Sequence, residues 1–312
     1  MMIKAPPKNT QIELIVDAQC AVGESLLWQA EQNALLWVDI PAQTLHRWDL
    51  AKSVHQTWQA PEMIGCIALK ASQAQGALGL IAGMATGVFD VQVAGSNLTA
   101  TPLAKAPHTA DNMRFNDGRC DRQGRLIAGT MRVDQAVGVG NPAVYQYAGG
   151  ALKTLIPAGF VSPFTTPNGT AFSPDGRTFY LSDSHTSQQH IWVFDYDTAT
   201  GTPHNRRSFV DMNAYAGRPD GAAIDLDGCY WICATDAGLI HRFTPAGVLD
   251  YSVAVPVKKP TICTWGGADL RTLFVASIRP SGINLSDQPL AGGMFAITGL
   301  GAQGVEEPRF AH

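Results

Sequence analysis

The chain has 312 residues, of which 46% are hydrophobic and 15% charged, with a formal net charge of −4 and a pI near 6.0. This balance excludes the basic surface of a nucleic-acid-binding protein, and no run of about 18 apolar residues predicts a transmembrane helix. The first residues, MMIKAPPKNTQIELIVDAQC, lack the apolar segment of a signal peptide, so we expect a cytoplasmic protein.

Short apolar runs of strand length recur along the whole chain. In order they are LLWVDI, ALGLIAG, GRLIAGTM, TFYLSDS, CYWICATD and TLFVASI. Each follows a turn signal such as SPDG or DLDG, and most are followed by a second strand-like run, such as TLHRWDL, GVFDVQV, HIWVFDYD or GGMFAIT. The sequence therefore predicts strands and tight turns, with no amphipathic helix longer than about two turns.

The spacing of these runs is typical of a repeated blade. Their reference positions lie 43 to 53 residues apart and are Trp37, Leu80, Ile127, Tyr180, Trp231 and Phe274. A period of about 40–50 residues with several strands per unit is the signature of a β-propeller. We therefore predict an all-β fold, a six-bladed β-propeller that forms a single domain over residues 1–312. The N-terminal run IELIVDA is expected to complete the last blade.

The cysteines do not form a metal-binding pattern. The chain has six cysteines, which are scattered and form no CxxC motif: Cys20, Cys66, Cys120, Cys229, Cys233 and Cys263. A zinc site would need closer pairs, so the pattern favours small, buried free thiols.

Three of the predicted units align by their turns. The stretches FNDGRCDRQG, PNGTAFSPDG and PDGAAIDLDG each place a polar residue seven positions before the same turn residue. These polar residues are Asn116, Asn168 and Asp220, which are spaced 52 residues apart. Asn-Gly and Asp-Gly are also turn formers, so any one of them alone could serve the backbone.

The first unit shares this register. Glu24 lies fifteen residues before Asp39, as Asn168 lies fifteen before Asp183, and the same spacing gives Ile262 in the sixth unit. Equivalent positions of a propeller converge on its axis, so four oxygen-bearing side chains would meet at one level. Such a set predicts a site for a hard cation, Ca²⁺, Mg²⁺ or Mn²⁺, with Fe²⁺ and Zn²⁺ as alternatives.

The residues beside this register suggest ligand contacts. The position two residues earlier reads Arg114, Thr166 and Arg218. The guanidinium of Arg114 could orient a polyol or a carboxylate, or it could pair with a nearby Asp. Asp117 and Asp183 could hold the ligands by hydrogen bonds, or they could cap turns.

The combination of motifs resembles a known family. GESLLW, RFNDGRCDRQGRLIAGTM, PNGTAFSPDGRTFYLSDS, RPDGAAIDLDGCYWICATDAG and LAGGMFAI are similar to segments of senescence marker protein (regucalcin), gluconolactonase and related sugar lactonases. The resemblance runs from about Cys20 to Phe295, and the later segments look closest to bacterial arabinonolactonase-like enzymes. It implies a six-bladed propeller with one divalent metal at the top of the central channel.

The resemblance also implies roles for particular residues. The metal ligands would be Glu24, Asn168 and Asp220. Arg114 and Asn116 match positions that bind substrate hydroxyls, so Asn116 is expected to contact substrate beside the metal rather than to act as a fourth ligand.

Two further residues are candidate substrate contacts. The loop RVDQAVGVGNP after AGTM would form a lid, in which Asp134 stands where some family members have Glu. His185, after SDS, could reach the site as a polar contact or could lie on the surface.

The implied function is metal-dependent hydrolysis of a sugar aldonolactone, a pentono- or hexonolactone such as arabinono- or galactonolactone, to the aldonic acid in carbohydrate catabolism. The metal would act as a Lewis acid and Asp220 as the candidate general base. We expect a monomer or weak homo-oligomer with a small-molecule substrate and no nucleic acid or membrane partner. The absence of GxSxG disfavours a serine nucleophile. The alternatives are a promiscuous metal-dependent phosphotriesterase and a non-catalytic calcium-binding propeller.

Overall fold

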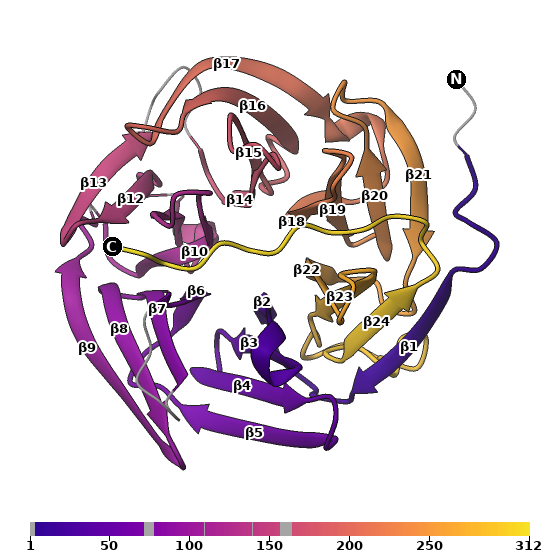
Figure 1. Ribbon diagram of the computed structural model, residues 1–312, viewed down its shortest axis with the longest axis horizontal. Helices are drawn as coiled ribbons and strands as arrows, with labels where there is room; N and C mark the ends of the chain where they lie inside the picture. The colour runs from indigo at the N-terminus through magenta and orange to yellow at the C-terminus, as the bar shows by residue number, and fades with distance from the viewer. Residues whose placement is uncertain (1–3, 72–77, 109, 139, 157–163) are drawn as a thin grey trace.

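Six four-stranded antiparallel sheets surround a common axis in a computed structural model of the protein (Figure 1). The structure describes residues 4–71, 78–108, 110–138, 140–156 and 164–312. This arrangement confirms the predicted all-β, six-bladed propeller. In every sheet the strand that comes first in the blade is innermost, as Figure 1 shows for β2, β6, β10, β14, β18 and β22.

Five blades are built from consecutive strands. Blade 1 contains β2 (Gly23–Gln29), β3 (Ala34–Asp39), β4 (Thr44–Asp49) and β5 (Val54–Gln59). Blade 2 contains β6 (Ile64–Leu69), β7 (Leu78–Met84), β8 (Gly87–Ala94) and β9 (Asn97–Lys105). Blade 3 contains β10 (Met113–Cys120), β11 (Leu126–Arg132), β12 (Val144–Ala148) and β13 (Ala151–Ile156). Blade 4 contains β14 (Pro167–Phe172), β15 (Thr178–Asp183), β16 (His190–Asp197) and β17 (Thr202–Asp211). Blade 5 contains β18 (Arg218–Ile224), β19 (Tyr230–Thr235), β20 (Leu239–Phe243) and β21 (Leu249–Ala254).

The sixth blade joins the two ends of the chain. It contains β22 (Pro260–Gly266), β23 (Thr272–Ser277), β24 (Met294–Thr298) and the N-terminal strand β1 (Gln11–Val16). β1 pairs antiparallel with β24, and this pairing confirms that the IELIVDA run completes the last blade. Because the first and last strands of the chain share one sheet, the last blade joins the two ends and closes the ring.

Helical structure in the described part of the chain is limited to three 3₁₀ turns. They are η1 (Ala30–Gln32), η2 (Gln135–Val137) and η3 (Met212–Ala214). Among the described residues, no helix has the length and apolarity needed to cross a membrane.

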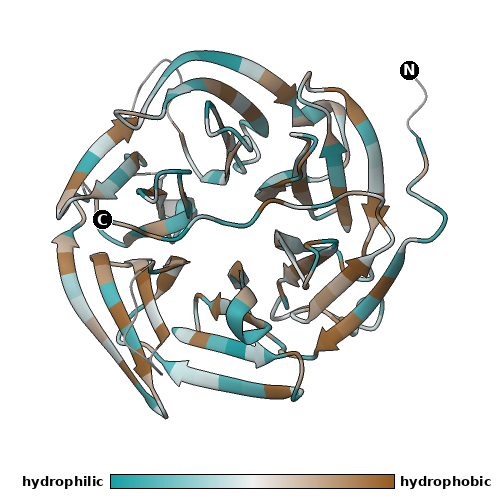
Figure 2. Cartoon of the chain, in the orientation of Figure 1, coloured by the Kyte–Doolittle hydropathy of each residue, from teal (hydrophilic) through white to brown (hydrophobic). Residues whose placement is uncertain are grey.

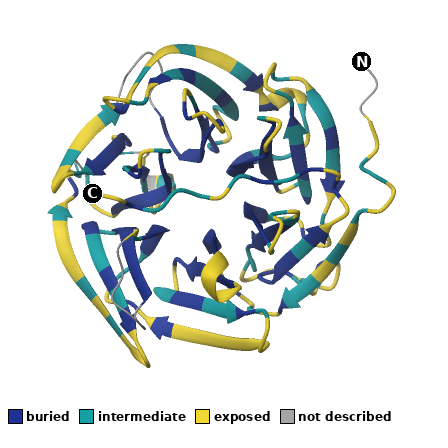
Figure 3. Ribbon diagram, viewed as in Figure 1, coloured by how far each residue is buried: buried dark blue, intermediate teal, exposed yellow. Residues whose placement is uncertain are grey.

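Burial falls from the axis to the rim of each blade (Figure 3). The inner strand β6 has the sequence IGCIAL and is buried throughout, whereas the outer strand β9, NLTATPLAK, is mostly exposed. The outer strands mix hydrophilic and hydrophobic residues along their length (Figure 2). Blades pack face to face, as where Leu36 and Val38 of blade 1 meet Ile67 and Leu80 of blade 2. A strand buried on both faces favours a continuous apolar run, which explains why the second strands of the blades, such as β7 with LGLIAGM, were visible in the sequence.

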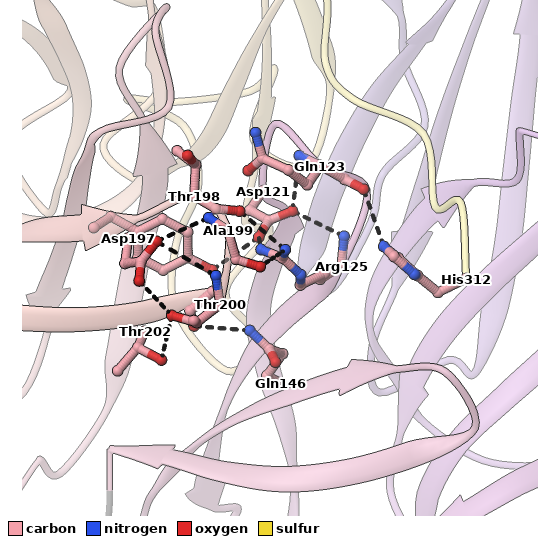
Figure 4. A network of polar contacts seen from close by, with 12 residues as sticks. Asp121, Gln123, Arg125, Gln146, Asp197, Thr198, Ala199, Thr200, Thr202 and His312 are labelled. Atoms are coloured by element: carbon pink, nitrogen blue, oxygen red, sulfur yellow. Dashed lines mark hydrogen bonds and ion pairs between the residues drawn. The ribbon is translucent and has the colours of Figure 1, made fainter.

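The DRQG turn of blade 3 is a rigid polar joint to blade 4 (Figure 4). The buried Asp121 carboxylate accepts the backbone N–H groups of Gln123 and Arg125, at 3.0 and 2.9 Å, and Arg125 Nη1 at 2.8 Å. Arg125 Nη2 donates in turn to the carbonyl oxygen of Thr198 in blade 4, at 3.0 Å. The ring of His312 meets the carbonyl oxygen of Gln123 at 3.0 Å, so the end of the chain joins the same network.

The C-terminal segment 299–312, here called the C-terminal strap, crosses the ring at the end where these turns lie (Figure 1). Gly304 forms a bridge with Asp225 of blade 5, and Phe310 forms one with Lys70 of blade 2. Phe310 also stacks on Tyr147 of blade 3, with ring centroids 5.8 Å apart. The strap therefore spans the face of the propeller opposite the ends at which the inner strands begin.

All six cysteines are buried and unpaired, as predicted. Burial raises the pKa of the Cys20 and Cys66 thiols to about 12, so both are neutral and unreactive near pH 7.

Candidate metal centre and substrate site

A register shift near the start of each inner strand positions the candidate residues. In β2 the shift lies between Glu24 and Leu27, and in β14 between Asn168 and Ala171. Shifts at the corresponding places occur in the other four inner strands. A β-bulge bends a strand and re-aims the side chains beside it. Gly169, which follows Asn168, has a φ of 59°, and its missing Cβ leaves room for Ser182 Oγ, which a methyl group would meet at 2.7 Å.

Strand pairing places Glu24 and Asn168 at equivalent positions. Gly23 pairs with Asp39, and Glu24 is the next residue after Gly23. Likewise Pro167 pairs with Asp183, and Asn168 is the next residue after Pro167. In blade 5, Pro219 pairs with Ala234, which puts Asp220 in the same place.

The expectation for the sixth blade was wrong by one residue. Pro260 pairs with Ser277, so the equivalent position is Thr261 and not Ile262. Between the paired residues Gly266 and Thr272 lies one residue more than between Gln29 and Ala34 of blade 1, and this longer turn upset the count. Ile262 is buried in an apolar cluster instead.

Thr261 and Asn116 make matching contacts with the next blade around the ring. Thr261 Oγ1 donates to the carbonyl oxygen of Gly23 at 2.5 Å, and Asn116 Nδ2 donates to that of Pro167 at 3.0 Å. The two residues thereby tie blade 6 to blade 1 and blade 3 to blade 4 at the level of the candidate site.

Asn168 and Asp220 are joined directly. Asn168 Nδ2 donates to Asp220 Oδ1 at 2.6 Å and to Ser184 Oγ at 2.9 Å. Ser184 Oγ donates to the carbonyl oxygen of Pro219 at 2.5 Å. These bonds hold the side chains of two predicted metal ligands in one network across blades 4 and 5.

The carboxylates at this level are buried and mutually repulsive. Glu24 is 9% exposed and Asp220 is 7% exposed. Burial, followed by the charges of Asp220 and Asp117, raises the pKa of Glu24 well above its usual range. Burial also raises the pKa of Asp220 to about 7, although the charge of Arg218 and the hydrogen bond from Asn168 act in the opposite direction.

Arg114 is a buried cation beside these acids. Its Nη1 donates to the carbonyl oxygen of Phe115 and to Asn116 Oδ1, both at 2.8 Å. Burial lowers the pKa of Arg114 to about 10, while the charges of Glu24 and Asp220 favour its protonated form. The alternative of a direct salt bridge with an Asp is not realised, since no ion pair found among the described residues involves Arg114.

The donor set fits a divalent cation. Two carboxylates and an amide converge there, and hard cations prefer such oxygen ligands. In the described part of the chain, neither Glu24 nor Asp220 belongs to an ion pair. Buried carboxylates without a direct ion-pair partner are costly even where a cation such as Arg114 lies nearby, and a bound metal ion would offset that cost.

Below the acids, Arg119 fills the axis of the propeller. Its Nε donates to the carbonyl oxygen of Thr170 at 3.0 Å, and its Nη2 donates to that of Cys263 at 3.2 Å and to that of Ala222. Its Nη1 pairs with Glu307 of the C-terminal strap at 2.6 Å. One guanidinium thus connects four inner strands and the strap, and it closes the axis on the strap side of the candidate site.

Asp117 and Asp183, for which the sequence allowed either support of the ligands or capping of a turn, have different roles. Asp117 Oδ2 accepts the backbone N–H of Thr170 at 2.6 Å, and its charge acts on Glu24. Asp183 instead accepts the N–H groups of Thr165, Thr166 and His185, so it fixes the turn before β14.

Asp134 and His185 lie on loops at the open end of the site. Asp134 Oδ1 accepts the N–H of Ala136 at 3.1 Å and begins the η2 turn, while His185 Nδ1 lies 2.7 Å from Ser187 Oγ. Among the described hydrogen bonds, none joins either residue to Glu24, Asn168 or Asp220.

Two contacts at the site were not anticipated. Gln135 Nε2, on the predicted lid loop, donates to Thr166 Oγ1 at 2.6 Å. Thr166 lies two residues before Asn168 in the chain, so this bond holds the loop beside the candidate site. Ser184, which bonds Asn168, also went unnoticed, although it immediately follows the Asp183 that marks the register.

Comparison with known proteins agrees with this architecture. Residues 22–279 match the model of the SMP-30/Gluconolactonase/LRE-like region. The chain belongs to this family. The expected enzyme class, a hydrolase of the gluconolactonase type, is thereby confirmed at the level of the family.

Relatives align over nearly their full length. Regucalcin of Bos taurus is 36% identical over 307 residues, which cover 95% of this chain and 97% of that protein. The 6-deoxy-6-sulfogluconolactonase of Pseudomonas putida is 35% identical over 305 residues, which cover 97% and 99%. The crystal structure of a calcium-binding protein, regucalcin, from Agrobacterium tumefaciens superposes with a TM-score of 0.87 at 23% identity and covers all of both chains, which shows a shared fold.

Proposed function

We propose that this protein hydrolyses a sugar aldonolactone, a pentono- or hexonolactone, to its aldonic acid, using one divalent cation held by Glu24, Asn168 and Asp220. The observation that carries the proposal is the pair of buried carboxylates, Glu24 and Asp220, which form no ion pair with any described residue and lie beside the buried Arg114–Asn116 unit. The family, and a relative at 35% identity whose name is that of a sugar lactonase, support a lactone as the substrate class.

The cation would supply Lewis acidity toward the lactone carbonyl. Arg114 and Asn116 orient the sugar: Nη1 of Arg114 fixes the amide of Asn116, which leaves Nε and Nη2 to donate to ring hydroxyls. Asp134 and His185, on the loops at the open end, are proposed to contact the outer part of the substrate.

Asp220 is proposed to move the proton. Its Oδ1 is held by Asn168, so Oδ2 is the oxygen that takes a proton from the attacking water. The water oxygen forms a bond to the carbonyl carbon, the bond between that carbon and the ring oxygen breaks, and the proton passes to the ring oxygen. The product is the open-chain hydroxy acid. A carboxylate beside a cation is a weaker base, and the pKa of about 7 that burial gives Asp220 counteracts this loss.

The test is hydrolysis of a panel of lactones followed with a pH indicator. EDTA-treated protein is offered arabinono-, xylono-, galactono- and gluconolactone, with Mg²⁺, Mn²⁺, Ca²⁺, Zn²⁺ or Fe²⁺ added back. Cation-dependent turnover of at least one lactone is expected. Turnover of paraoxon without turnover of any lactone would instead favour a phosphotriesterase, and cation binding without turnover of either would favour a non-catalytic binding propeller.

A further inference from the structure

Charge is distributed unevenly around the open end of the candidate site. Outside the site itself, the loops and adjoining strand ends of blades 1 to 3 at this end carry four acids against two bases: Asp39, Glu62, Asp111 and Asp134 against Lys105 and Arg132. Those of blades 5 and 6, with the segment that follows β1, carry four bases against three acids: Arg218, Lys258, Lys259 and Arg279 against Asp17, Asp236 and Asp287. One side of the opening is therefore positive.

The centre of the positive side is a carboxylate shared by two cations. Arg218 Nε donates to Asp236 Oδ2 at 2.6 Å, and Lys259 pairs with the other oxygen of Asp236. The side chains of Arg218 and Lys259 are each 30% exposed, so both can still meet a ligand. Asp236 neutralises only one of the two cations, and Asp220, on which the charge of Arg218 also acts, would be neutralised by the proposed metal cation, so a net positive charge is left at this point.

This cluster is connected to the proposed cation site. Arg218 lies two residues before Asp220 on β18, and its Nη1 donates to the carbonyl oxygen of Ser184 at 3.1 Å. Ser184 Oγ accepts the hydrogen bond from Asn168. A substrate whose carbonyl lies at Asp220 could therefore extend its far end over Arg218.

A groove lies between blades 5 and 6, on residues that adjoin Asp236 and Lys259 in the chain. It has a volume of about 460 Å³ and is lined by residues 237–238, 255–258 and 287–290. Gly238 N donates to the carbonyl oxygen of Lys258 at 3.0 Å, which joins the two walls directly beside Asp236 and Lys259. Small-molecule pockets typically measure about 300–1,000 Å³, so the groove is large enough for a ligand group that extends past the cluster.

We propose that Arg218 and Lys259 form an anion subsite that binds an acidic group of the lactone, a carboxylate, phosphate or sulfonate, at the end away from the carbonyl carbon. The subsite rests on the proposed lactonase function, because it defines which lactones that site prefers. The simpler role for the cluster is a salt bridge that holds blade 5 to blade 6, and the two roles differ in substrate selectivity.

Selectivity tests the subsite. The ratio of kcat/KM for 6-phosphogluconolactone, for glucarolactone and for 6-deoxy-6-sulfogluconolactone to that for gluconolactone is measured with Mn²⁺-loaded protein. Lys259→Gln should lower at least one of these ratios about ten-fold, the effect of losing one hydrogen bond to a charged group. Lys52→Gln is the matched control, since Lys52 also pairs with an Asp but lies on blade 1, and it should leave every ratio unchanged. The anion that shows the largest change identifies the acidic group.

Calorimetry separates failure of the subsite from failure of catalysis. Binding of gluconate, glucarate, 6-phosphogluconate and 6-deoxy-6-sulfogluconate to the same Mn²⁺-loaded proteins needs no turnover. If no lactone is hydrolysed but Lys259→Gln weakens a doubly charged acid about ten-fold relative to gluconate, the subsite stands and the lactonase function falls. If Lys259→Gln changes neither the catalytic nor the binding ratios while its unfolding temperature stays within a few degrees of the wild type, the cluster is only a salt bridge and the proposal is overturned.

Discussion

Replacing Asp220 by Asn should stabilise the cation-free protein in alkaline solution. Burial raises the pKa of Asp220 to about 7 in the folded chain, whereas an unfolded Asp titrates near about 3.9. The folded state therefore binds this proton more tightly, so its stability falls as the pH rises from about 4 to about 7. Three pKa units correspond to at most about 4 kcal/mol. Asn removes this cost and retains an oxygen for the hydrogen bond from Asn168.

The assay is urea denaturation in EDTA, followed by tryptophan fluorescence at pH 8 and pH 5. Asp220→Asn should exceed the wild type by up to about 4 kcal/mol at pH 8 and by less than half of that at pH 5. Asp195→Asn is the control, because Asp195 is exposed and paired with Arg207, and it should not stabilise the protein. Mn²⁺ should raise the unfolding temperature of the wild type but not that of Asp220→Asn. An Asp220→Asn protein no more stable than the wild type at pH 8 would refute the reasoning.

Three further predictions concern other charged groups. Arg114→Gln should retain cation binding by calorimetry but lower kcat/KM for a lactone about 100-fold, since it removes oriented donors from the substrate; a loss of cation binding would show a different role. Burial lowers the pKa of His46 to about 4, so the wild type should lose up to about 3 kcal/mol of stability as the pH falls from about 6.5 to 4. His46→Gln should lose less over that range in urea titrations, and an equal loss would assign the effect elsewhere. Glu307→Gln should destabilise the fold by about 3 kcal/mol, because it leaves buried Arg119 without its counter-charge; Glu306→Gln, whose neighbouring contact uses the backbone carbonyl, is the control in the same assay.

The blades were predictable because the second strand of each blade is buried on both faces over most of its length. An apolar run such as LGLIAGM of β7 is easy to recognise in the sequence, and the recurrence of such runs predicted the number of blades. Closure by β1 also followed, since the last blade lacked one strand. The outer strands, such as β9 with NLTATPLAK, carry a weaker signal because most of their residues face solvent.

The register that gathers Glu24, Asn168 and Asp220 was visible because equal spacing reflects equal position in each blade. It failed at Thr261, where one additional residue in a turn shifts the count. The additional residue lies in the turn between Gly266 and Thr272, and a turn of either length is compatible with residues such as Gly and Asp, so the sequence alone does not reveal the insertion.

Contacts between segments far apart in the chain could not be predicted from the sequence. Arg119 bonds three carbonyl oxygens on other blades and a carboxylate of the C-terminal strap, and backbone carbonyls carry no sequence signal. The cluster of Arg218, Asp236 and Lys259 likewise depends on how blades 5 and 6 meet. Such contacts arise from the closure of the ring rather than from local residue preference.

Anomalous diffraction from crystals of the protein loaded with Mn²⁺ would test the central claim most directly. A single strong anomalous peak is expected between about 2.0 and 2.6 Å from oxygens of Glu24, Asn168 and Asp220, and it should be absent from crystals of Asp220→Asn. A peak at any other place in the wild type, or no peak at a Mn²⁺ concentration that supports lactone turnover, would contradict the assignment of the metal centre.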